Sequence, residues 1–317
     1  MFALCVESSH ARGMGHFYRA LNLAEALAQA GMACTLYLND HAPSRQILAA
    51  RGLSHRVVDL QDFAANWEAA LIKRDGITLW ANDRLDTDVR HGEKIKAAGI
   101  PLVTFDDRGT GAALADLHIA ALPFVAQEQL AGVKVLRGAD YLILNPQIRH
   151  YTRVRKHLGS ILVTLGGSDT YGVTVNVVQL LNEMNLTATV VVGPGFMHLN
   201  ALEDALSDGF VLKRGVPSMI AEFHQHDLAI TGGGITPFEA NASGLPCVVI
   251  ANELYEIPNG MALQKLGGSF FAGYHQSLRL PSIRADLPLE QMSRGGMKNI
   301  GLEGAQRVIG ALRELVH

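Results

Sequence analysis

Cysteine is scarce in this sequence, which has three in 317 residues, at Cys5, Cys34 and Cys247. All three lie in apolar runs typical of buried strands, and none forms a CxxC pair. We therefore expect no disulfide framework and no zinc or redox chemistry, and buried thiols of this kind suit a cytoplasmic protein. A membrane span is not expected, because no uncharged apolar run is long enough. A signal peptide is not expected either, since the first apolar run, residues 2–6, is short and has no basic leader.

An excess of one charge sign is also missing. The chain carries 27 basic and 30 acidic side chains, which gives a net charge of −3. Without an extended basic block, nucleic acid is not an expected partner. The histidines at His10, His91 and His118 have no metal-like spacing with carboxylates, so we expect no metal and no cofactor. Oligomeric state cannot be assigned from the sequence.

Length and apolar content indicate two packed domains. The chain is longer than a typical single domain, and 48% of its residues are hydrophobic against 18% charged. Strand-like apolar runs alternate with helical stretches, which predicts the α/β class. We expect Rossmann-like domains at 1–150 and 158–301, and a final helix at 302–317 that packs back on the first domain. The basic stretch 150–157 between them is interpreted as a solvated linker, and a cleft between two such domains is a common small-molecule site.

The N-terminal half opens with a strand–loop–helix–strand unit. Residues 2–6 indicate a buried parallel strand. Apolar residues at helical spacing over 17–30 end at Gly31, a suitable helix C-cap, and a second strand follows at 33–38. This order is typical of the start of a Rossmann-like sheet. Further strands are predicted at 55–58, 76–79, 102–105 and 116–120, a strand-like stretch from 138, and helices at 43–51, 62–73 and 88–98.

The loop after the first strand contains Gly13-Met-Gly15-His16. It is not a dinucleotide fingerprint, because the third glycine position holds Tyr18, and it lacks the Gly-Lys-Ser/Thr of a P-loop. His16 stands where the helix starts, and a helix N-terminus disfavours the charged imidazolium. A neutral imidazole beside an open loop is a candidate general base. A capping or packing role is the alternative.

Two carboxylates, Asp106 and Asp107, follow the strand predicted at 102–105. The carboxyl ends of parallel strands form the ligand edge of such a sheet. Contact with sugar hydroxyls and capping of the next turn are both compatible with this position.

A first glycine loop in the C-terminal half, Gly166-Gly167-Ser168, joins a predicted strand at 160–165 to a helix at 173–184. A helix start of this kind suits a phosphate. Further strands are predicted at 187–192, 210–213, 228–231 and 247–251, with helices at 217–223 and 259–266.

A second glycine loop, at 232–234, precedes a helix that begins at Thr236-Pro237, where proline suits the first turn. Glycines here let the backbone approach a ligand and leave the first helical N–H groups for an anion. Glu239, on the first turn, suits hydrogen bonds from sugar hydroxyls rather than contact with phosphate. These features indicate a nucleotide or nucleotide-sugar site, and close helix–strand packing is the alternative role of the glycines.

Taken in order, these motifs resemble the UDP-sugar hydrolases of nonulosonic (pseudaminic) acid biosynthesis, which are related to the spore-coat polysaccharide SpsG proteins. The resemblance covers nearly the whole chain. It rests on Gly13-Met-Gly-His16-Phe-Tyr-Arg19-Ala-Leu-Asn-Leu-Ala24, Asp106-Asp107, Gly138-x-x-Tyr141-x-x-Leu144-x-Pro146-x-x-Arg149 and Thr164-Leu-Gly-Gly-Ser168-Asp169. The stretch that holds Gly233, Glu239, Gly244 and Pro246 is similar both to these hydrolases and to MurG-type glycosyltransferases.

The resemblance implies a GT-B fold, in which two Rossmann-like domains face a central cleft and the C-terminal domain holds most of the UDP. It implies His16 as the catalytic residue, the glycine loops as the diphosphate site, Glu239 at the ribose, Val216 at the base and Asn259 near the sugar phosphate. One departure is at the end of the first strand, where the family commonly has Arg-x-Asp or Arg-x-Glu. The implied binding positions are Gly13, Gly15, Arg19, Asp106, Asp107, Gly166, Gly167, Ser168, Val216, Gly233, Gly234, Glu239 and Asn259, and the departure is Cys5 with Glu7 retained.

The predicted activity is hydrolysis of a small-molecule UDP-linked amino-deoxysugar, of the UDP-2,4-diacetamido-2,4,6-trideoxyhexose type. His16 would activate water for a single inverting displacement. An inverting glycosyltransferase would use the same residues with an acceptor hydroxyl in place of water. The absence of an apolar, basic membrane-facing patch in the N-terminal half favours hydrolysis. A non-catalytic nucleotide-sugar-binding protein is the third interpretation.

Overall fold

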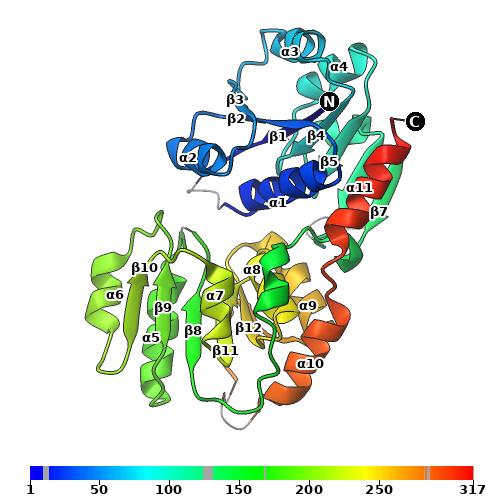
Figure 1. The fold of residues 1–317 in the computed structure, drawn as a ribbon. Helices are drawn as coiled ribbons and strands as arrows, with labels where there is room; N and C mark the ends of the chain where they lie inside the picture. Colours follow the sequence, from blue (N-terminus) through cyan, green and yellow to red (C-terminus); the bar gives the residue numbers. More distant parts are fainter. Residues whose placement is uncertain (10–13, 124–130, 168, 282, 284–285, 317) are drawn as a thin grey trace. The chain divides into compact units, whose positions relative to one another are not determined.

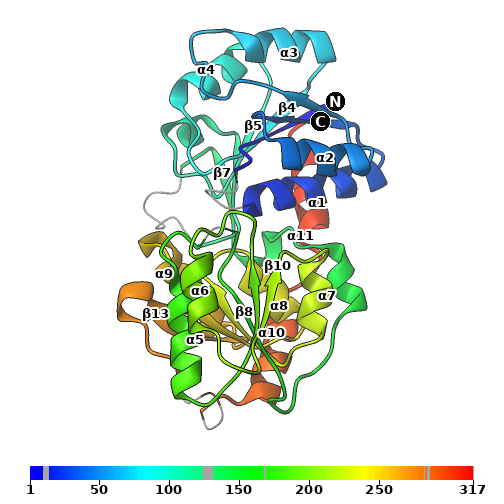
Figure 2. The same ribbon diagram turned by 90° about the vertical axis from the view of Figure 1, so that its left-hand side faces the viewer.

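The computed structural model describes residues 1–9, 14–123, 131–167, 169–281, 283 and 286–316. They form two units, each built on one parallel sheet (Figures 1 and 2). Unit 1 comprises residues 1–9 and 14–144 with the segment that starts at Glu303, and unit 2 runs from Asn145 to Leu302. These two Rossmann-like units confirm the predicted α/β class. Among the described residues, no helix is both long and apolar enough to cross a bilayer.

The described part of unit 1 contains a seven-stranded parallel sheet in the order β3-β2-β1-β4-β5-β6-β7. The order reverses between β1 and β4, and ligands of open α/β sheets bind at the carboxyl ends of the strands next to such a reversal. The strands are β1 (Phe2–Val6), β2 (Cys34–Leu38), β3 (His55–Val57), β4 (Leu79–Asp83), β5 (Leu102–Phe105), β6 (Leu117–Ala120) and β7 (Lys134–Arg137).

Helices cover both faces of this sheet (Figure 1). Strand side chains alternate between the two faces, so Ala3 and Cys5 of β1 both point to one side. There they share a buried cluster with Leu71 and Ile95, which come from α3 and α4. The helices of unit 1 are α1 (Gly15–Gln29), α2 (Ala42–Ala50), α3 (Trp67–Asp75), α4 (Val89–Ala97) and α11 (Gly304–Glu314).

The described part of unit 2 contains a six-stranded parallel sheet in the order β10-β9-β8-β11-β12-β13, which reverses between β8 and β11. The strands are β8 (Ile161–Thr164), β9 (Thr189–Val192), β10 (Val211–Arg214), β11 (Leu228–Gly232), β12 (Cys247–Ala251) and β13 (Ser269–Tyr274). The helices are α5 (Val173–Glu183), α6 (Leu199–Ala205), α7 (Met219–His224), α8 (Thr236–Ala242), α9 (Ile257–Lys265) and α10 (Leu289–Asn299).

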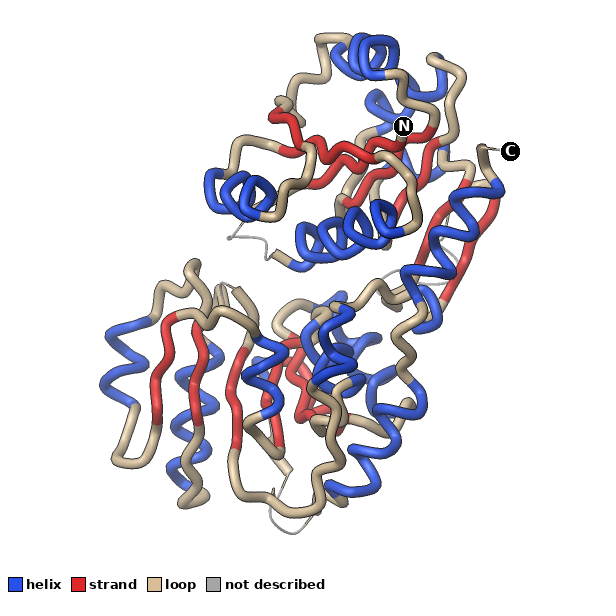
Figure 3. The backbone as a smooth tube through the Cα atoms, viewed as in Figure 1, coloured by secondary structure: helices blue, strands red, loops and turns tan. Residues whose placement is uncertain are grey.

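The core of unit 2 explains its continuous apolar strands. Helices lie on both sides of the sheet (Figure 3), so both faces of a central strand are buried and neither needs polar residues. On one face Val163 and Ile230 pack with Val177 of α5 and Leu202 of α6. Because both faces are buried, β8, β11 and β12 are short apolar runs and can be predicted from the sequence.

Some element predictions are wrong. The strand expected at 76–79 is displaced to β4, because Gly76 is the left-handed C-cap of α3, with φ +61°. The stretch from 138 turns as a short 3₁₀ helix instead of a strand, and the edge strand β7 lies just before it. Charged residues at both ends of β7 removed its apolar signal, and the strand β13 is missing from the prediction although its sequence is largely apolar.

The basic stretch 150–157 is not the solvated linker that its charges indicate. Arg155 is fully buried in unit 2, and its guanidinium donates to the carbonyls of Phe223 at 2.8 Å, of His226 at 3.2 Å and of Ser243. Phe223 and Ser243 stand at the C-terminal ends of α7 and α8, where the helix dipole favours a cation. Burial lowers the pKa of Arg155 to about 10. This arginine therefore joins two helix ends inside the unit.

Candidate functional site

The predicted catalytic histidine has a carboxylate partner. His16 lies in the first turn of α1, directly after the loop that leaves β1, and its Nδ1 is 2.7 Å from Oδ1 of Asp83. Asp83 is the last residue of β4, which pairs with β1 at the reversal of strand order. An imidazole whose Nδ1–H is held by a carboxylate presents its Nε2 as a proton acceptor. The His16 side chain is 22% exposed, so this pair remains open to a reactant.

Arg19 fixes the carboxylate of this pair. It lies one helical turn after His16, and its Nε and Nη2 donate to both oxygens of Asp83, at 2.8 and 2.6 Å. Its Nη1 donates to Asp106, at the end of the neighbouring strand β5. Burial opposes the charge of Arg19, but the two carboxylates outweigh it and raise the pKa of the guanidinium. Burial likewise opposes the charge of Asp83, and Arg19 together with His16 lowers the pKa of that carboxyl.

Asp106 is held in an unusual backbone conformation. Its φ is +46°, a left-handed value that is rare for a residue with a side chain. The conformation directs one carboxylate oxygen to Arg19 and the other to the backbone N–H of Leu122, at 2.8 Å. A strained residue that is retained inside a charged network is typical of functional sites. Asp106 thus anchors the far end of the His16–Asp83–Arg19 arrangement.

Asp107 takes the other of its two predicted roles. Its carboxylate accepts hydrogen bonds from the backbone N–H groups of Thr87, at 2.9 Å, and Gly109, at 2.8 Å, and from the Thr87 hydroxyl. Burial raises its pKa in spite of these hydrogen bonds. The contacts of Asp107 therefore cap a turn, while His16, Arg19 and Asp106 are brought together. The sequence analysis missed Asp83, because the strand predicted at 76–79 ended before this residue and left it in a loop.

The first glycine loop of unit 2 has open space in front of it. A Cβ built on Gly166 or Gly167 would meet no heavy atom of the described residues within 4 Å, and Gly166 has a φ of +97°. Behind the loop, Gly193 packs so closely that its Cβ would lie 2.6 Å from the Cα of Gly167. The backbone of this loop is thus supported from behind and accessible in front. Ser168, the third residue predicted in this loop, lies outside the described residues. Of the two glycines predicted beside His16, Gly13 also lies outside them, and Gly15 is the first residue of α1.

The first N–H groups of α5 already have an acceptor, while diphosphate binding by the glycine loop before it stays a prediction. The carboxylate of Asp169 already accepts the first helical N–H groups, from Val173 at 2.9 Å and Thr174 at 2.7 Å. A carboxylate at this position satisfies the helix end and repels a second anion. These two N–H groups are therefore not available to a ligand phosphate while Asp169 accepts them.

The glycines of the second loop differ in role: one serves close packing and another leaves the backbone open to a ligand. A Cβ on Gly233 would lie 2.8 Å from Cβ of Glu256, so this glycine serves close packing. Within the part of the chain that the structure describes, a Cβ on Gly234 would meet no atom within 4 Å and no side chain caps the start of α8. Asn259 supports the loop by donating from Nδ2 to the Gly233 carbonyl at 2.8 Å, while its buried Oδ1 has no partner among the described residues. The open backbone is at Gly234 and the start of α8.

Glu239 and Val216 stand at other points of the same sheet edge. The Glu239 carboxylate accepts a hydrogen bond from the Asn145 backbone, and burial raises its pKa to about 7. Val216 follows β10, which lies three strands from β11. Three strand spacings amount to about 14 Å, a distance that a nucleoside diphosphate can bridge. The unit 2 candidates thus form a line along one edge of the sheet.

Comparison with known proteins shows what the sequence and the fold are similar to. No family model matches the chain. The sequence is 23% identical to the spore coat polysaccharide biosynthesis protein SpsG of Bacillus subtilis strain 168, over 98% of this chain and 96% of SpsG. The fold is similar to MurG of Acinetobacter baumannii, with TM-score 0.68, 16% identity and 99% of both chains covered. It is also similar to a UDP-GlcNAc 2-epimerase of Neisseria meningitidis bound to UDP-GlcNAc, with TM-score 0.64, 11% identity, and 99% of this chain and all of that one covered.

The similarity to SpsG and the GT-B-like fold, both expected from the sequence motifs, are confirmed by these comparisons. At such low identities the solved structures establish the fold alone. Hydrolysis and a place in pseudaminic acid synthesis remain predictions. The chain is thus a GT-B-like α/β protein with sequence similarity to a spore coat polysaccharide biosynthesis protein.

Proposed function

We propose that this protein is an inverting glycosyltransferase that uses a UDP-sugar donor in polysaccharide assembly. The observation that carries the proposal is the His16–Asp83 pair, held by Arg19 and Asp106 at the reversal of strand order in unit 1. A histidine oriented by a buried carboxylate is the arrangement that activates a hydroxyl group. The similarity to SpsG, a polysaccharide biosynthesis protein, supports transfer to a sugar acceptor.

His16 acts as the general base in the proposed reaction. Its Nε2 takes the proton of an acceptor hydroxyl while that oxygen bonds to the anomeric carbon of the donor. The bond from the anomeric carbon to the UDP oxygen breaks on the opposite face, so the configuration inverts and UDP leaves with the bonding electrons. Asp83 stabilises the imidazolium that forms, and Arg19 keeps Asp83 in place. The proton on Nε2 then passes to solvent.

Unit 2 is assigned the nucleotide. Gly234 and the start of α8 offer uncapped backbone N–H groups to the diphosphate, whereas Asp169 closes the start of α5. Glu239 is assigned to the ribose hydroxyls and Val216 to the base. Burial raises the pKa of Glu239 to about 7, which increases its uncharged fraction at neutral pH and reduces its repulsion of a nearby phosphate.

Hydrolysis of the UDP-sugar is the second candidate. The motif Gly13-Met-Gly-His16-x-x-Arg19 favours it, because this motif resembles the UDP-sugar hydrolases. Water then replaces the acceptor, and the roles of His16 and Asp83 are unchanged.

The test is incubation with UDP-N-acetylglucosamine and with a UDP-2,4-diacetamido-trideoxyhexose, each with and without saccharide acceptors, followed by chromatography of UDP. UDP release that requires an acceptor and falls about 10²- to 10⁴-fold in His16→Ala supports the transferase. Release without any acceptor, with the same loss in the variant, supports the hydrolase. The exposed His150 provides the matched control, His150→Ala, with unchanged turnover expected. UDP-sugar binding without release under any condition would contradict both enzymes.

A further inference from the structure

Tyr171 of unit 2 makes contacts that span the carboxyl edge of the sheet. It lies in the loop between β8 and α5, and its hydroxyl donates to Oε1 of Glu253, which follows β12, at 3.0 Å. Its ring stacks on that of His275, which follows β13, with the centroids 4.4 Å apart and an angle of 17° between the planes. Because β13 is three strand spacings, or about 14 Å, from β8, the loop itself extends across the ends of β11 and β12.

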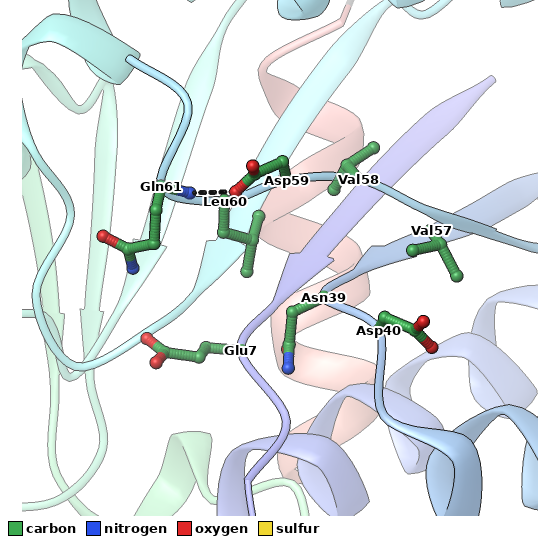
Figure 4. Close-up of a pocket in the computed structure, with 8 residues that line it drawn as sticks. All are labelled: Glu7, Asn39, Asp40, Val57, Val58, Asp59, Leu60 and Gln61. Atoms are coloured by element: carbon green, nitrogen blue, oxygen red, sulfur yellow. Dashed lines mark hydrogen bonds between the residues drawn. The ribbon is translucent and has the colours of Figure 1, made fainter.

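Loops at the carboxyl edge of unit 1 are held by nearer groups. Several of them line a cavity of about 440 Å³ (Figure 4). Asn39, after β2, accepts the N–H of Ser8, after the adjacent β1, at 2.7 Å and donates to its carbonyl at 2.9 Å. Oδ1 of Asp59 accepts the N–H of Gln61, in the same loop, at 2.9 Å (Figure 4). Such short-range contacts fix a loop above its own strand, whereas those of Tyr171 draw a loop toward strands that are not its neighbours.

The loop that carries Tyr171 starts in contact with the second glycine loop. Leu165 is the last residue before the first glycine loop, and its carbonyl accepts a hydrogen bond from Nδ2 of Asn252 at 3.3 Å. A Cβ built on Gly232 would lie 3.4 Å from the same carbonyl oxygen. The two glycine loops therefore leave the sheet side by side, and a loop drawn toward β13 is drawn toward residues 232–234.

The backbone of this loop depends on anchors from both sides. Gly166 and Asp169 have φ values of +97° and +43°, and a left-handed value is uncommon for a residue with a side chain such as Asp169. Such a conformation persists where the surrounding structure imposes it. The Gly167 carbonyl accepts the N–H of Gly195, after β9, at 3.1 Å, which holds the loop on one side of β8. The contacts of Tyr171 hold it on the opposite side.

The exposure of Tyr171 indicates a positioning role rather than a part in the core. Tyr171 is 46% exposed, so it buries only part of its ring. The hydrogen bond to Glu253 raises the pKa of the Tyr171 hydroxyl, which keeps it protonated, and a donor, over a wider range of pH. Donation to a carboxylate is stronger than donation to a neutral acceptor, and the stack on His275 orients the ring.

We propose that Tyr171 is a positioning residue for the UDP diphosphate, which holds the open backbone of the first glycine loop beside Gly234 and the start of α8. The proposal rests on the proposed function, which assigns the nucleotide to unit 2. Both loops have open space in front of their glycines among the described residues, and a diphosphate has two phosphate groups to contact. Loops that are set in place before the ligand arrives lower the entropic cost of binding. Tyr171 acts through the loop, so its loss should weaken contacts to phosphate and spare those to uridine.

Calorimetry with uridine and with UDP on the whole protein tests this role. Tyr171→Leu should weaken UDP binding about tenfold and leave uridine binding within about twofold of the wild type, because only the diphosphate contacts depend on the loop. Tyr171→Phe keeps the stack and loses the hydrogen bond, so its UDP affinity should fall between the two. Tyr151→Leu is the matched control, since Tyr151 also packs against a histidine of unit 2, His224, and wild-type affinities are expected. Equal weakening of uridine and UDP in Tyr171→Leu, or unchanged UDP affinity, would overturn the proposal.

A double variant shows whether Tyr171 acts through Glu253. Tyr171→Phe and Glu253→Ala remove the same hydrogen bond, so together they should weaken UDP binding no more than the larger single effect. Glu253→Gln keeps an acceptor oxygen and should retain most of the UDP affinity. Additive effects of the two single variants would overturn the proposal.

NMR of the glycine amides separates this proposal from the proposed function. Without any ligand, the amide signals of Gly166 and Gly167 should move in Tyr171→Leu and stay in place in Tyr151→Leu. Unmoved signals together with normal UDP binding would overturn the proposal and leave the proposed function intact. Failure of the wild type to bind UDP would contradict the proposed function, and moved signals would then still support the hold of Tyr171 on the loop.

Discussion

The carboxyl edges of the two sheets solve different chemical problems. In unit 1 the edge is a network of charged side chains, in which His16, Arg19, Asp83 and Asp106 hold one another. In unit 2 the corresponding edge includes three glycines, Gly166, Gly167 and Gly234, that have open space in front of them among the described residues. A side-chain network can move a proton at a defined atom, whereas open backbone can approach and bind an anion. The two units share an architecture and divide the proposed reaction between them.

Two buried arginines show the same contrast. Arg19 donates to carboxylates, and its charge is balanced at the site. Arg155 donates to backbone carbonyls at 2.8 to 3.2 Å and holds two helix ends together. The first arginine positions functional groups, and the second stabilises the unit that carries the open loops.

The largest effect is expected from Asp83→Asn. The amide cannot hold the Nδ1–H of His16 as a carboxylate does, and it leaves Arg19 with a weaker partner. Turnover should fall about 10²- to 10⁴-fold while UDP affinity stays within twofold, as measured by kinetics and calorimetry. A loss of UDP affinity with normal turnover would contradict the assignment of proton transfer to unit 1 and of UDP binding to unit 2.

Arg155→Leu should destabilise unit 2. Several buried carbonyls lose their donor, which costs about 2–4 kcal/mol of the free energy of unfolding. Arg155→Lys should recover only part of this, because an ammonium lacks the planar fork of donors. Denaturant unfolding measures both, and Lys156→Leu, at the exposed neighbouring position, is the control. An equal loss of stability in Lys156→Leu would show that unit 2 needs positive charge in residues 150–157 and not the specific hydrogen bonds of Arg155.

The glycines of the second loop should respond in opposite ways. Gly233→Ala meets Glu256 and should lower the free energy of unfolding by about 1–3 kcal/mol. Gly234→Val enters open space, so it should leave stability unchanged and weaken UDP binding at least tenfold, or about 1.4 kcal/mol. Thermal unfolding and calorimetry on both variants check this. Unaltered UDP affinity in Gly234→Val would contradict the assignment of the backbone at Gly234 to the nucleotide site.

The smallest effect is expected from Glu239→Gln and depends on pH. The folded-state pKa of Glu239 is raised from 4.5 to about 7, so the folded protein retains this proton longer than the unfolded chain. Stability from this group is therefore present below pH 4.5 and is lost as the pH rises to 7. The variant should match the wild type at pH 4.5 and exceed it by about 1–2 kcal/mol at pH 8. Denaturant unfolding at both pH values tests this, and a difference that is constant with pH would contradict it.

Much of the fold was predictable from the sequence because both sheets are buried on two sides. Strands such as β1 and β12 are short apolar runs, and helices such as α1 carry apolar residues at helical spacing. The edge strands were not predictable, since β7 has charged residues at both ends and half-buried ones between them. Strand ends were less certain still, and the four-residue error at β4 concealed Asp83.

The site was predictable only in its residue types. His16 stands at a recognisable helix start and Asp106 follows a recognisable strand. The sequence does not show that Arg19 contacts Asp106, because that contact depends on which strands are neighbours. The polar end of β4, Asn82-Asp83, resembles Asp106-Asp107 after β5 and could have identified the missing carboxylate. Asp169 was not predicted to cap a helix. Its carboxylate accepts the first N–H groups of α5, which the sequence analysis expected to be open to a phosphate.

The His16 network also limits when the proposed general base can be assembled during synthesis. His16 and Asp83 are 67 residues apart in the chain, and Arg19 and Asp106 are 87 apart. No nascent chain that lacks β5 can contain the complete arrangement, however much helix it has formed. Contacts between such distant positions also form late in folding, because long loops must close first. The proposed proton acceptor therefore depends on the joined ends of β4 and β5, and its presence would mark their assembly with α1.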